Sequence, residues 1–400
     1  MGITFLMLFS CSKPHQIYRS MVSDRYFLRS DATIQTDSIR YLLLEMTALC
    51  GEFPAEQLQR LIPSQSYAEK VITSLKAEKL LRTHYRDRLR GYRLTKKSKA
   101  LLLETNPSRF RFYLTGNSET NQIRSEPMRR LRLHQKAETY LTLFHAGIPL
   151  FPDEKPDLFS AKPIRAVPDM RSLPYFYTSR EVKQLGADTT KIKNSRSIGV
   201  LLASDCVFVL YNTGTSLLKW EYRTEIRVNA FLQHYLTGNP YSKIPEVRAI
   251  MLGTDMETAL KLMSSTGGYK KSLFMLDTSY EHFHFLPNTP EGAAILKLLC
   301  NRRLCRKLQQ LLRSDLYDRD ETLTIEHDAL SASGEVVLFA YDFDMIRINR
   351  FNTSLNLFGY SGVIVAFDFQ IPPLKKHLSA NVQYSSIDFL KFKRGFLHET

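Results

Sequence analysis

Residues 81–103 read LRTHYRDRLRGYRLTKKSKALLL, and this stretch decides the fold predicted for the first part of the chain. Eight Lys or Arg residues fall within the eighteen positions 82–99, against one acid, Asp87. A solvated helix face normally mixes both signs. RTHYR and RGYRL instead read as two short strands around a turn at 87–90, and Thr95 then caps the helix KKSKALLLET. The stretch therefore predicts a basic β-hairpin followed by a helix.

Three helical patterns precede this hairpin. TDSIRYLLLEMTALCG, residues 36–51, has apolar residues at helical spacing between a capping Asp37 or Ser38 and a final glycine. PAEQLQRLI, residues 54–62, predicts a short second helix opened by proline. SQSYAEKVITSLKAEKLL, residues 64–81, predicts a third helix with an inward stripe of apolar side chains: Tyr67, Val71, Leu75 and Leu80.

Together these elements predict a winged helix-turn-helix at 32–114 that binds duplex DNA, with the third helix in the major groove and the hairpin along the backbone. The outward polar candidates on the third helix are Gln65, Ser66, Lys70, Thr73 and Ser74. The basic candidates on and beside the hairpin are Arg82, Arg86, Arg88, Arg90, Arg93, Lys96 and Lys97. Neutralising about five phosphates would give a slope of log affinity against log salt of about −4 to −5. A winged helix used as a protein-interaction module is the alternative.

Composition supports a folded protein with an anionic partner. The chain has 400 residues, 44% of them hydrophobic, and a formal net charge of +15. The segment 82–132 holds fourteen Lys or Arg and four acids, which is +10 of that excess. A positive electrostatic field concentrated in one segment favours binding to a polyanionic partner such as nucleic acid. No apolar run approaches a membrane span, and five scattered cysteines indicate reduced thiols, so we expect a cytoplasmic protein without a disulfide frame.

The same features divide the rest of the chain. Residues 1–31 predict a disordered leader, because their short apolar stretch lacks the preceding cation of a signal peptide. The polar stretch TGNSETNQIRSEP, 115–127, predicts a linker. We expect an α/β domain at 128–245 and a C-terminal α/β extension at 246–400 packed on it.

Strands and helices alternate beyond the linker, which places the whole chain in the α+β or α/β class, with a mixed sheet in this region. A helix at 128–146 is followed by PYFYTSREV, by the apolar runs SIGVLLAS and CVFVLYN, and by LLKWEY, which is predicted as a strand. A helix at 225–236 and the strand VRAIMLG come next. The resulting αβββαβ order resembles the core of restriction-endonuclease-like folds, although this order is permissive.

Those nucleases hold Mg²⁺ between an Asp and a Glu on neighbouring strands, with a Lys two residues after the Glu. Asp205 and, sixteen residues later, Glu221 with Arg223 fit that spacing and are the catalytic candidates. Ser204 stands where a proline is usual, and Arg223 is a poor proton acceptor. Asp205 could instead form the turn between two apolar strands. We therefore expect no cofactor unless the nuclease is active, in which case it would use Mg²⁺.

The chain from Tyr41 to Leu236 resembles the replication-relaxation family of plasmids and integrative elements. The resemblance rests on RGYRLTKKSKALL and on the later helix RLRLHQKAETYLTLFHAGI, which are followed by the α/β pattern. It implies a winged helix, then a helix containing His, then a nuclease-like domain. It also implies a role at an origin of replication or transfer, as a DNA-bound accessory of the relaxation machinery, with a relaxase or replication proteins as partners.

Other clusters carry weaker signals. His282 and His284 are two residues apart and therefore share one face of a predicted strand. No third ligand follows at suitable spacing, so no metal site is assigned. Two apolar strands end in carboxylates that could hold a cation or pair with Arg347 and Arg350: Asp342, Asp344 and Asp368. NRRLCRKLQQLLR, 301–313, predicts a basic amphipathic helix that is solvated or contacts DNA. The sequence contains no phosphate-binding GxxxxGK[ST] loop.

The sequence thus predicts a DNA-binding accessory protein of a mobile element, acting in replication, DNA relaxation or conjugative transfer, with a non-catalytic α/β docking module. Proteins of this class commonly bind repeated DNA sites as homodimers, so a homodimer is expected. Two alternatives stay open. The first is a Mg²⁺-dependent nuclease that uses Asp205, Glu221 and Arg223. The second is a transcriptional repressor whose α/β region senses a ligand.

Overall fold

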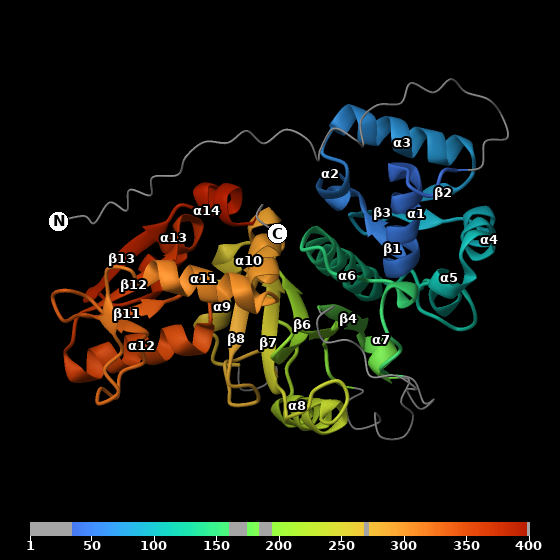
Figure 1. The fold of residues 1–400 in the computed structure, drawn as a ribbon. Coiled ribbons are helices and arrows are strands. Elements are labelled where there is room, and N and C mark those ends of the chain that lie inside the picture. Colours follow the sequence, from blue (N-terminus) through green and yellow to red (C-terminus); the bar gives the residue numbers. More distant parts are fainter. Residues whose placement is uncertain (1–33, 160–173, 184–193, 268–271, 398–400) are drawn as a thin grey trace.

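The computed structural model describes residues 34–159, 174–183, 194–267 and 272–397, so the predicted leader, 1–31, lies outside the described residues (Figure 1). Within these ranges the chain is a mixed α+β protein with one three-stranded and two five-stranded sheets, which confirms the predicted class. None of the described helices combines the length and the apolar character needed to span a bilayer.

The N-terminal unit contains the helices and the hairpin that the sequence predicts, together with one additional short strand, β1, and one additional helix, α5. Its elements are α1 (Ile39–Cys50), β1 (Glu52–Pro54), α2 (Leu58–Leu61), α3 (Gln65–Ala77), β2 (Leu81–Arg86), β3 (Leu89–Leu94), α4 (Lys96–Thr105) and α5 (Pro107–Leu114). The side chains of Ser38, Ser64 and Thr95 cap α1, α3 and α4, which satisfies backbone N–H groups that the helices leave free. The sheet order is β1-β3-β2, and both pairings are antiparallel.

One inward residue of α3 was predicted wrongly. Val71 and Leu75 are buried, as is Leu80 just after the helix, whereas Tyr67 is 49% exposed. Ala68 fills the inward position instead, with 2% of its surface exposed. Tyr67 therefore belongs to the outer surface near the start of α3.

Helix α6 (Pro127–His145) joins the N-terminal unit to the rest of the molecule (Figure 1). One hydrophobic cluster runs from α1, through Ala137 and Leu141 of α6, into the central sheet at Phe208 and Leu210. The predicted linker is folded rather than extended. The hydroxyls of Ser118 and Thr120 donate to a carbonyl of α5, and Lys99 donates to Asn121. The N-terminal unit is therefore packed on the α/β region through α6.

The central sheet has the order β4-β5-β6-β7-β8. Its first three strands are antiparallel, and β6, β7 and β8 are parallel. Its strands are β4 (Tyr175–Thr178), β5 (Gly199–Leu202), β6 (Cys206–Gly214), β7 (Glu246–Gly253) and β8 (Phe283–Pro287). Its helices are α7 (Ser179–Val182), α8 (Tyr222–Leu236), α9 (Met256–Met263) and α10 (Pro290–Leu299). Side chains of α6 and α10 pack on one face, and those of α8 and α9 pack on the other.

The predicted strand LLKWEY is wrong. Residues 217–221 form no strand, and Glu221 is the N-cap residue of α8. Trp220 instead packs against Tyr211, Phe274 and Phe283, and its indole donates to Asp277. The apolar residues of this segment therefore serve as a plug in the core between β6 and β8. The third antiparallel strand of the sheet comes from β4, earlier in the chain.

The second five-stranded sheet has the order β13-β12-β11-β10-β9, and β11, β12 and β13 are parallel. Its elements are α11 (Arg302–Leu312), β9 (Tyr317–Asp318), β10 (Ala329–Leu330), β11 (Val336–Phe339), α12 (Met345–Phe358), β12 (Gly362–Phe367), α13 (Ile371–His377), β13 (Val382–Ile387) and α14 (Phe389–Phe396). The segment after β11 meets the edge strand β8, where the backbone N–H of Phe285 donates to the carbonyl of Phe343 at 3.0 Å. The carboxyl end of β11 therefore lies against the central sheet.

Candidate functional site

The outer face of α3 is polar and exposed. Gln65, Ser66, Lys70 and Thr73 are all exposed, as the sequence predicted. Ser74 is half-buried and donates a hydrogen bond to Glu78 at 3.0 Å, so it is held against the helix end rather than presented outward. The exposed face therefore consists of the first two turns and Thr73.

The β2–β3 hairpin carries exposed arginines beside α3. Arg82, Arg86, Arg88 and Arg90 are exposed, and Lys96 and Lys97 follow at the start of α4. Arg86 pairs with the exposed Asp87 at 3.4 Å, and the guanidinium groups of the other three make no ion pair with any described residue. Exposed pairs of this kind are weak. Most of the hairpin's positive charge is therefore directed to solvent.

The hairpin turn is tight and unusual in sequence. Asp87 and Arg88 have φ of 52° and 60°, as the two central residues of a type I′ turn require. Glycine or asparagine normally occupies the second position, because a Cβ atom there costs about 1–2 kcal/mol. The turn thus places the arginine side chain of Arg88 at the tip, at the expense of backbone stability.

Arg93 was predicted to contact DNA, and this prediction is wrong. Its side chain is 4% exposed and pairs with the fully buried Glu52 at 2.6 Å. Arg82 and Arg93 are cross-strand partners on the sheet face that packs against α6. A strand alternates its side chains between two faces. Arg93 therefore points toward α6, whereas Arg90 points to the opposite face of the hairpin.

Arg130, on α6, holds the hairpin in place through hydrogen bonds to its backbone. Its guanidinium is fully buried and donates to three hairpin carbonyls, those of His84, Arg86 and Leu89, at 3.3, 2.7 and 2.9 Å. It also binds Glu52 at 2.6 Å. Carbonyl groups near the turn would otherwise be free at this edge. The hairpin is therefore fixed in direction relative to α6.

Glu52 holds this network together. Burial alone would raise its pKa, but hydrogen bonds from His134, Arg130 and Arg93 outweigh burial and hold the pKa of Glu52 at about 2. Gly91 lies against the same carboxylate, because a Cβ atom there would come within 2.4 Å of its Oε1. The glycine in the basic stretch is thus required by the ion network under the hairpin.

A groove of about 340 Å³ separates α3 from the hairpin. Gln65, Ala68 and Tyr92 line it, together with Arg90 and two acids, Glu56 and Glu69. Because the acids oppose a polyanion here, the hairpin tip and the start of α3 are the parts of this surface suited to phosphate.

The three predicted catalytic residues do not form a site. Asp205 lies exposed in the turn between β5 and β6, 3.6 Å from Arg302 of α11, which agrees with the turn alternative. Glu221 and Arg223 lie at the exposed start of α8. Trp220, the residue before Glu221, packs on Tyr211. Tyr211 lies six residues after Asp205 on an extended strand, which separates Asp205 from Tyr211 by roughly 20 Å. Asp205 and Glu221 therefore cannot hold one metal ion.

A different carboxyl group, Glu225, is buried near the start of α8. It is 2% exposed and accepts hydrogen bonds from the hydroxyls of Tyr211, Tyr280 and Ser195. Burial raises the pKa of Glu225 to about 7, although these hydrogen bonds act in the opposite direction. The neighbouring cavity, lined in part by Ser195, measures about 10 Å³, which has room for about one water molecule. The group is suited to proton storage in the core rather than to ligand binding.

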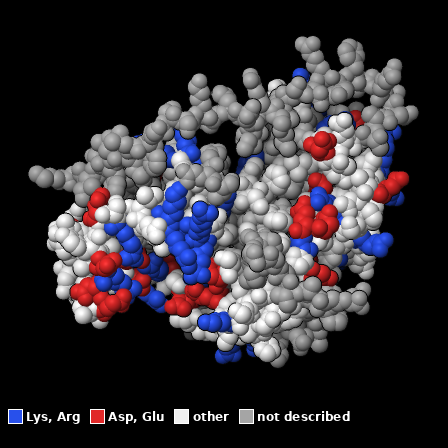
Figure 2. All heavy atoms as spheres, viewed as in Figure 1, with Lys and Arg blue, Asp and Glu red and all other residues white. Residues whose placement is uncertain are grey.

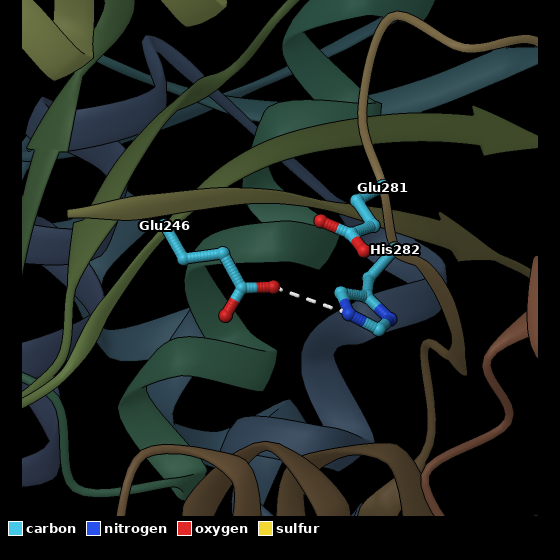
Figure 3. Close-up of side chains that lie close together, drawn as sticks. All are labelled: Glu246, Glu281 and His282. Carbon is cyan, nitrogen blue, oxygen red and sulfur yellow. Dashed lines mark ion pairs between the residues drawn. The ribbon is translucent and has the colours of Figure 1, made fainter. Parts of the chain in front are cut away.

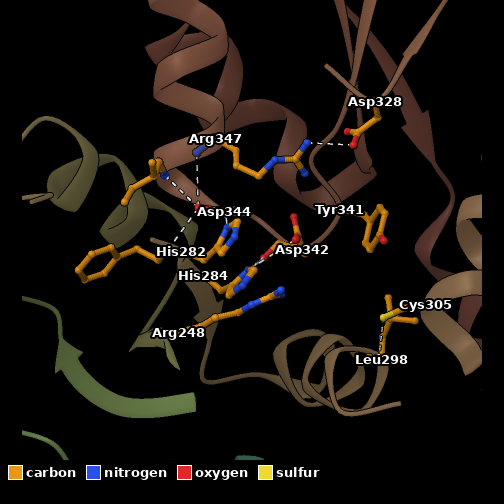
Figure 4. Close-up of polar contacts among 12 residues, drawn as sticks. Arg248, His282, His284, Leu298, Cys305, Asp328, Tyr341, Asp342, Asp344 and Arg347 are labelled. Atoms are coloured by element: carbon orange, nitrogen blue, oxygen red, sulfur yellow. Dashed lines mark hydrogen bonds and ion pairs between the residues drawn. The ribbon is translucent and has the colours of Figure 1, made fainter. Parts of the chain in front are cut away.

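A second polar cluster lies where the two five-stranded sheets meet (Figure 4). His282 Nδ1 contacts the buried Asp344, and His284 Nδ1 lies 3.2 Å from the carbonyl oxygen of Asp342. The hydrogen bonds with Asp344 and Glu246 raise the pKa of His282 despite its burial, whereas burial lowers the pKa of His284. The pKa values of the two imidazoles are therefore shifted in opposite directions.

The predicted pairing of the strand-end acids with arginines is wrong. Arg347 binds Glu326 and Asp328, both at 2.9 Å, and Asp344 caps α12. Asp368 is exposed and directly follows β12. His284 is 1% exposed. The sequence reasoning missed Glu246, because the pairing of β7 with β8 alone brings it to His282.

No known protein family matches the chain, and neither the curated proteins nor the solved structures include a match. The resemblance to the replication-relaxation family therefore stays a prediction from sequence.

Proposed function

We propose that the N-terminal unit is a winged helix that binds duplex DNA, with α3 in the major groove and the β2–β3 hairpin on the sugar-phosphate backbone. The observation that carries this proposal is the exposed polar face of α3 beside a hairpin whose Arg82, Arg88 and Arg90 have no acidic partner among the described residues. Unpaired exposed cations on one short hairpin attract a polyanion and release its counterions.

The support beneath the hairpin favours the same function. Arg130 fixes three hairpin carbonyls, and Glu52 forms ion pairs with both Arg130 and Arg93. A rigid hairpin loses little conformational freedom when it meets DNA, so more of the contact energy appears as affinity. The uncommon Arg88 at the turn also favours a role for its side chain, since it opposes turn stability.

The α/β region, in this proposal, is a non-catalytic module that docks replication or transfer proteins such as a relaxase. The element order α6-β4-α7-β5-β6-α8-β7, which adds only the short helix α7 to the predicted pattern, supports a restriction-endonuclease-like origin for it. The separation of Asp205 from Glu221 argues against nuclease activity at those residues. The assignment to a mobile element rests on the sequence resemblance alone.

DNA binding is tested by fluorescence anisotropy with a labelled 30-base-pair duplex at fixed salt. One variant replaces three hairpin arginines, R86Q/R88Q/R90Q. The matched control, R223Q/R227Q/K243Q, removes three exposed cations on and near α8, at the opposite end of the molecule from α3 (Figure 1). Both variants lose the same net charge.

We expect at least a roughly tenfold loss of affinity in the hairpin variant and little change in the control, because contacts to phosphate act locally. Equal losses in the two variants would show that the effect is only net charge. Release of the wild-type complex by a small molecule would instead favour a ligand-sensing repressor.

A further inference from the structure

Three potential metal ligands come together at the start of β7 and β8 (Figure 3). Oxygen atoms of Glu246 and Glu281 and a ring nitrogen of His282 all lie within 4.8 Å of one another. His282 Nε2 is 3.1 Å from Glu246 Oε1. Glu281 is exposed and makes no ion pair or hydrogen bond with another described residue, so its carboxylate is available.

A hydrogen bond from Nδ1 to Asp344 fixes the orientation of the His282 imidazole. Asp344, which is 1% exposed and fixed as the N-cap of α12, accepts a hydrogen bond from Nδ1. A carboxylate on one ring nitrogen is the arrangement that directs the other nitrogen toward a metal. His282 therefore presents Nε2 toward Glu246 and Glu281 in a set direction.

A second imidazole on the same strand face lacks a partner. His284 is 1% exposed, and its Nε2 has no hydrogen-bond partner. Its ring lies 6.0 Å from that of His282, with 14° between the two planes (Figure 4). His282 Nε2 faces Glu246, whose other carboxylate oxygen pairs with Arg248 at 2.6 Å, and Arg248 lies next to His284 (Figure 4). A buried nitrogen without a partner is the kind of group that a water molecule or an ion can satisfy.

We propose that Glu246, Glu281 and His282 bind a divalent transition-metal ion such as Mn²⁺. One imidazole nitrogen and two carboxylate oxygens suit this class of ion, and three protein ligands leave positions open for water or for an oxygen ligand. The ion would take the place of the direct contact between His282 Nε2 and Glu246 Oε1. Asp344 would hold the ring, and the unpartnered His284 would border the ion's water shell.

The surroundings suit an anionic ligand on that ion. Figure 2 shows Lys and Arg side chains gathered over α11, with acidic side chains at one end of this basic stripe. Arg302, Arg303 and Arg306 of α11 are all exposed. An ion with open positions beside such a stripe would present two kinds of positive charge to a phosphate group.

The site is tested by electron paramagnetic resonance of Mn²⁺ titrated into the full chain without DNA, because the six-line signal of free Mn²⁺ disappears on binding. The variant E281Q removes one ligand that makes no other contact among the described residues, so its folding should be unaffected. The control E104Q removes an equally exposed carboxylate from α4.

We expect one bound Mn²⁺ per wild-type chain, E104Q like wild type, and at least roughly tenfold weaker binding in E281Q, as when a metal site loses part of its shell. Competition by Zn²⁺ should restore the free Mn²⁺ signal. No stoichiometric binding by wild type, or equal binding by E281Q and E104Q, would overturn the proposal. Neither result depends on whether the N-terminal unit binds DNA.

Discussion

The buried acid Glu225 should make the stability of this protein fall as pH rises through neutrality. Its folded pKa is about 7, against an ordinary value of 4.5. Between those two pH values the folded state binds a proton that the unfolded state has released. The free energy of unfolding therefore decreases with rising pH in this window.

The size of the effect follows from the difference of about 2.5 between the two pKa values, which corresponds to about 3 kcal/mol. Glu225→Gln replaces the acid by a neutral group of the same shape that can still accept from Tyr211. The variant should match wild type near pH 4.5 and should exceed it in unfolding free energy by about 3 kcal/mol above pH 7.5.

Urea unfolding at a series of pH values measures this directly. Trp220 is the only tryptophan, and its ring lies 5.1 Å from that of Tyr211, which bonds to Glu225, so its fluorescence reports on this part of the core. Other titrating groups are present in both proteins and cancel in the difference. A difference that stays constant from pH 5 to pH 8 would refute the reasoning.

Two further substitutions test the support of the hairpin. Glu52→Gln should lower the unfolding free energy by about 3–5 kcal/mol, because it leaves Arg93 and Arg130 buried without a counter-charge, and urea unfolding at pH 7 measures the loss. Wild type should lose the contribution of Glu52 only as pH falls from about 4.5 toward 2, since its folded pKa is lowered. Arg88→Gly should leave the unfolding free energy unchanged or higher, because glycine accepts the positive φ. The same substitution should weaken DNA binding in an anisotropy assay. An unchanged affinity would exclude Arg88 from the interface.

The hairpin and its neighbouring helices were predictable because their signals are local. Caps, apolar spacing and the two short strands each lie within a few residues, and they placed α1, α3, β2, β3 and α4 correctly. The fate of individual arginines was not predictable. Arg93 and Arg90 lie on opposite faces of β3, and Arg93 is paired because it meets Glu52, which is 41 residues away in the sequence and is brought close by the pairing of β1 with β3.

The α/β region shows the same limit more strongly. LLKWEY has the composition of a strand, but Trp220 is used as a core plug, so the spacing between Asp205 and Glu221 had no structural meaning. The cluster around His282 depends on three separate segments that only the sheets bring together. Such contacts leave no periodic pattern in one sequence.

The salt dependence of DNA affinity tests the central claim most directly. Five neutralised phosphates predict a slope of about −4.5, which is roughly a 500-fold loss of affinity between 50 and 200 mM salt. For R86Q/R88Q/R90Q the slope should fall to about −1.8, which is roughly a twelvefold loss, whereas R223Q/R227Q/K243Q should keep the wild-type slope. Identical slopes for all three proteins would contradict the assignment of the hairpin to the DNA backbone.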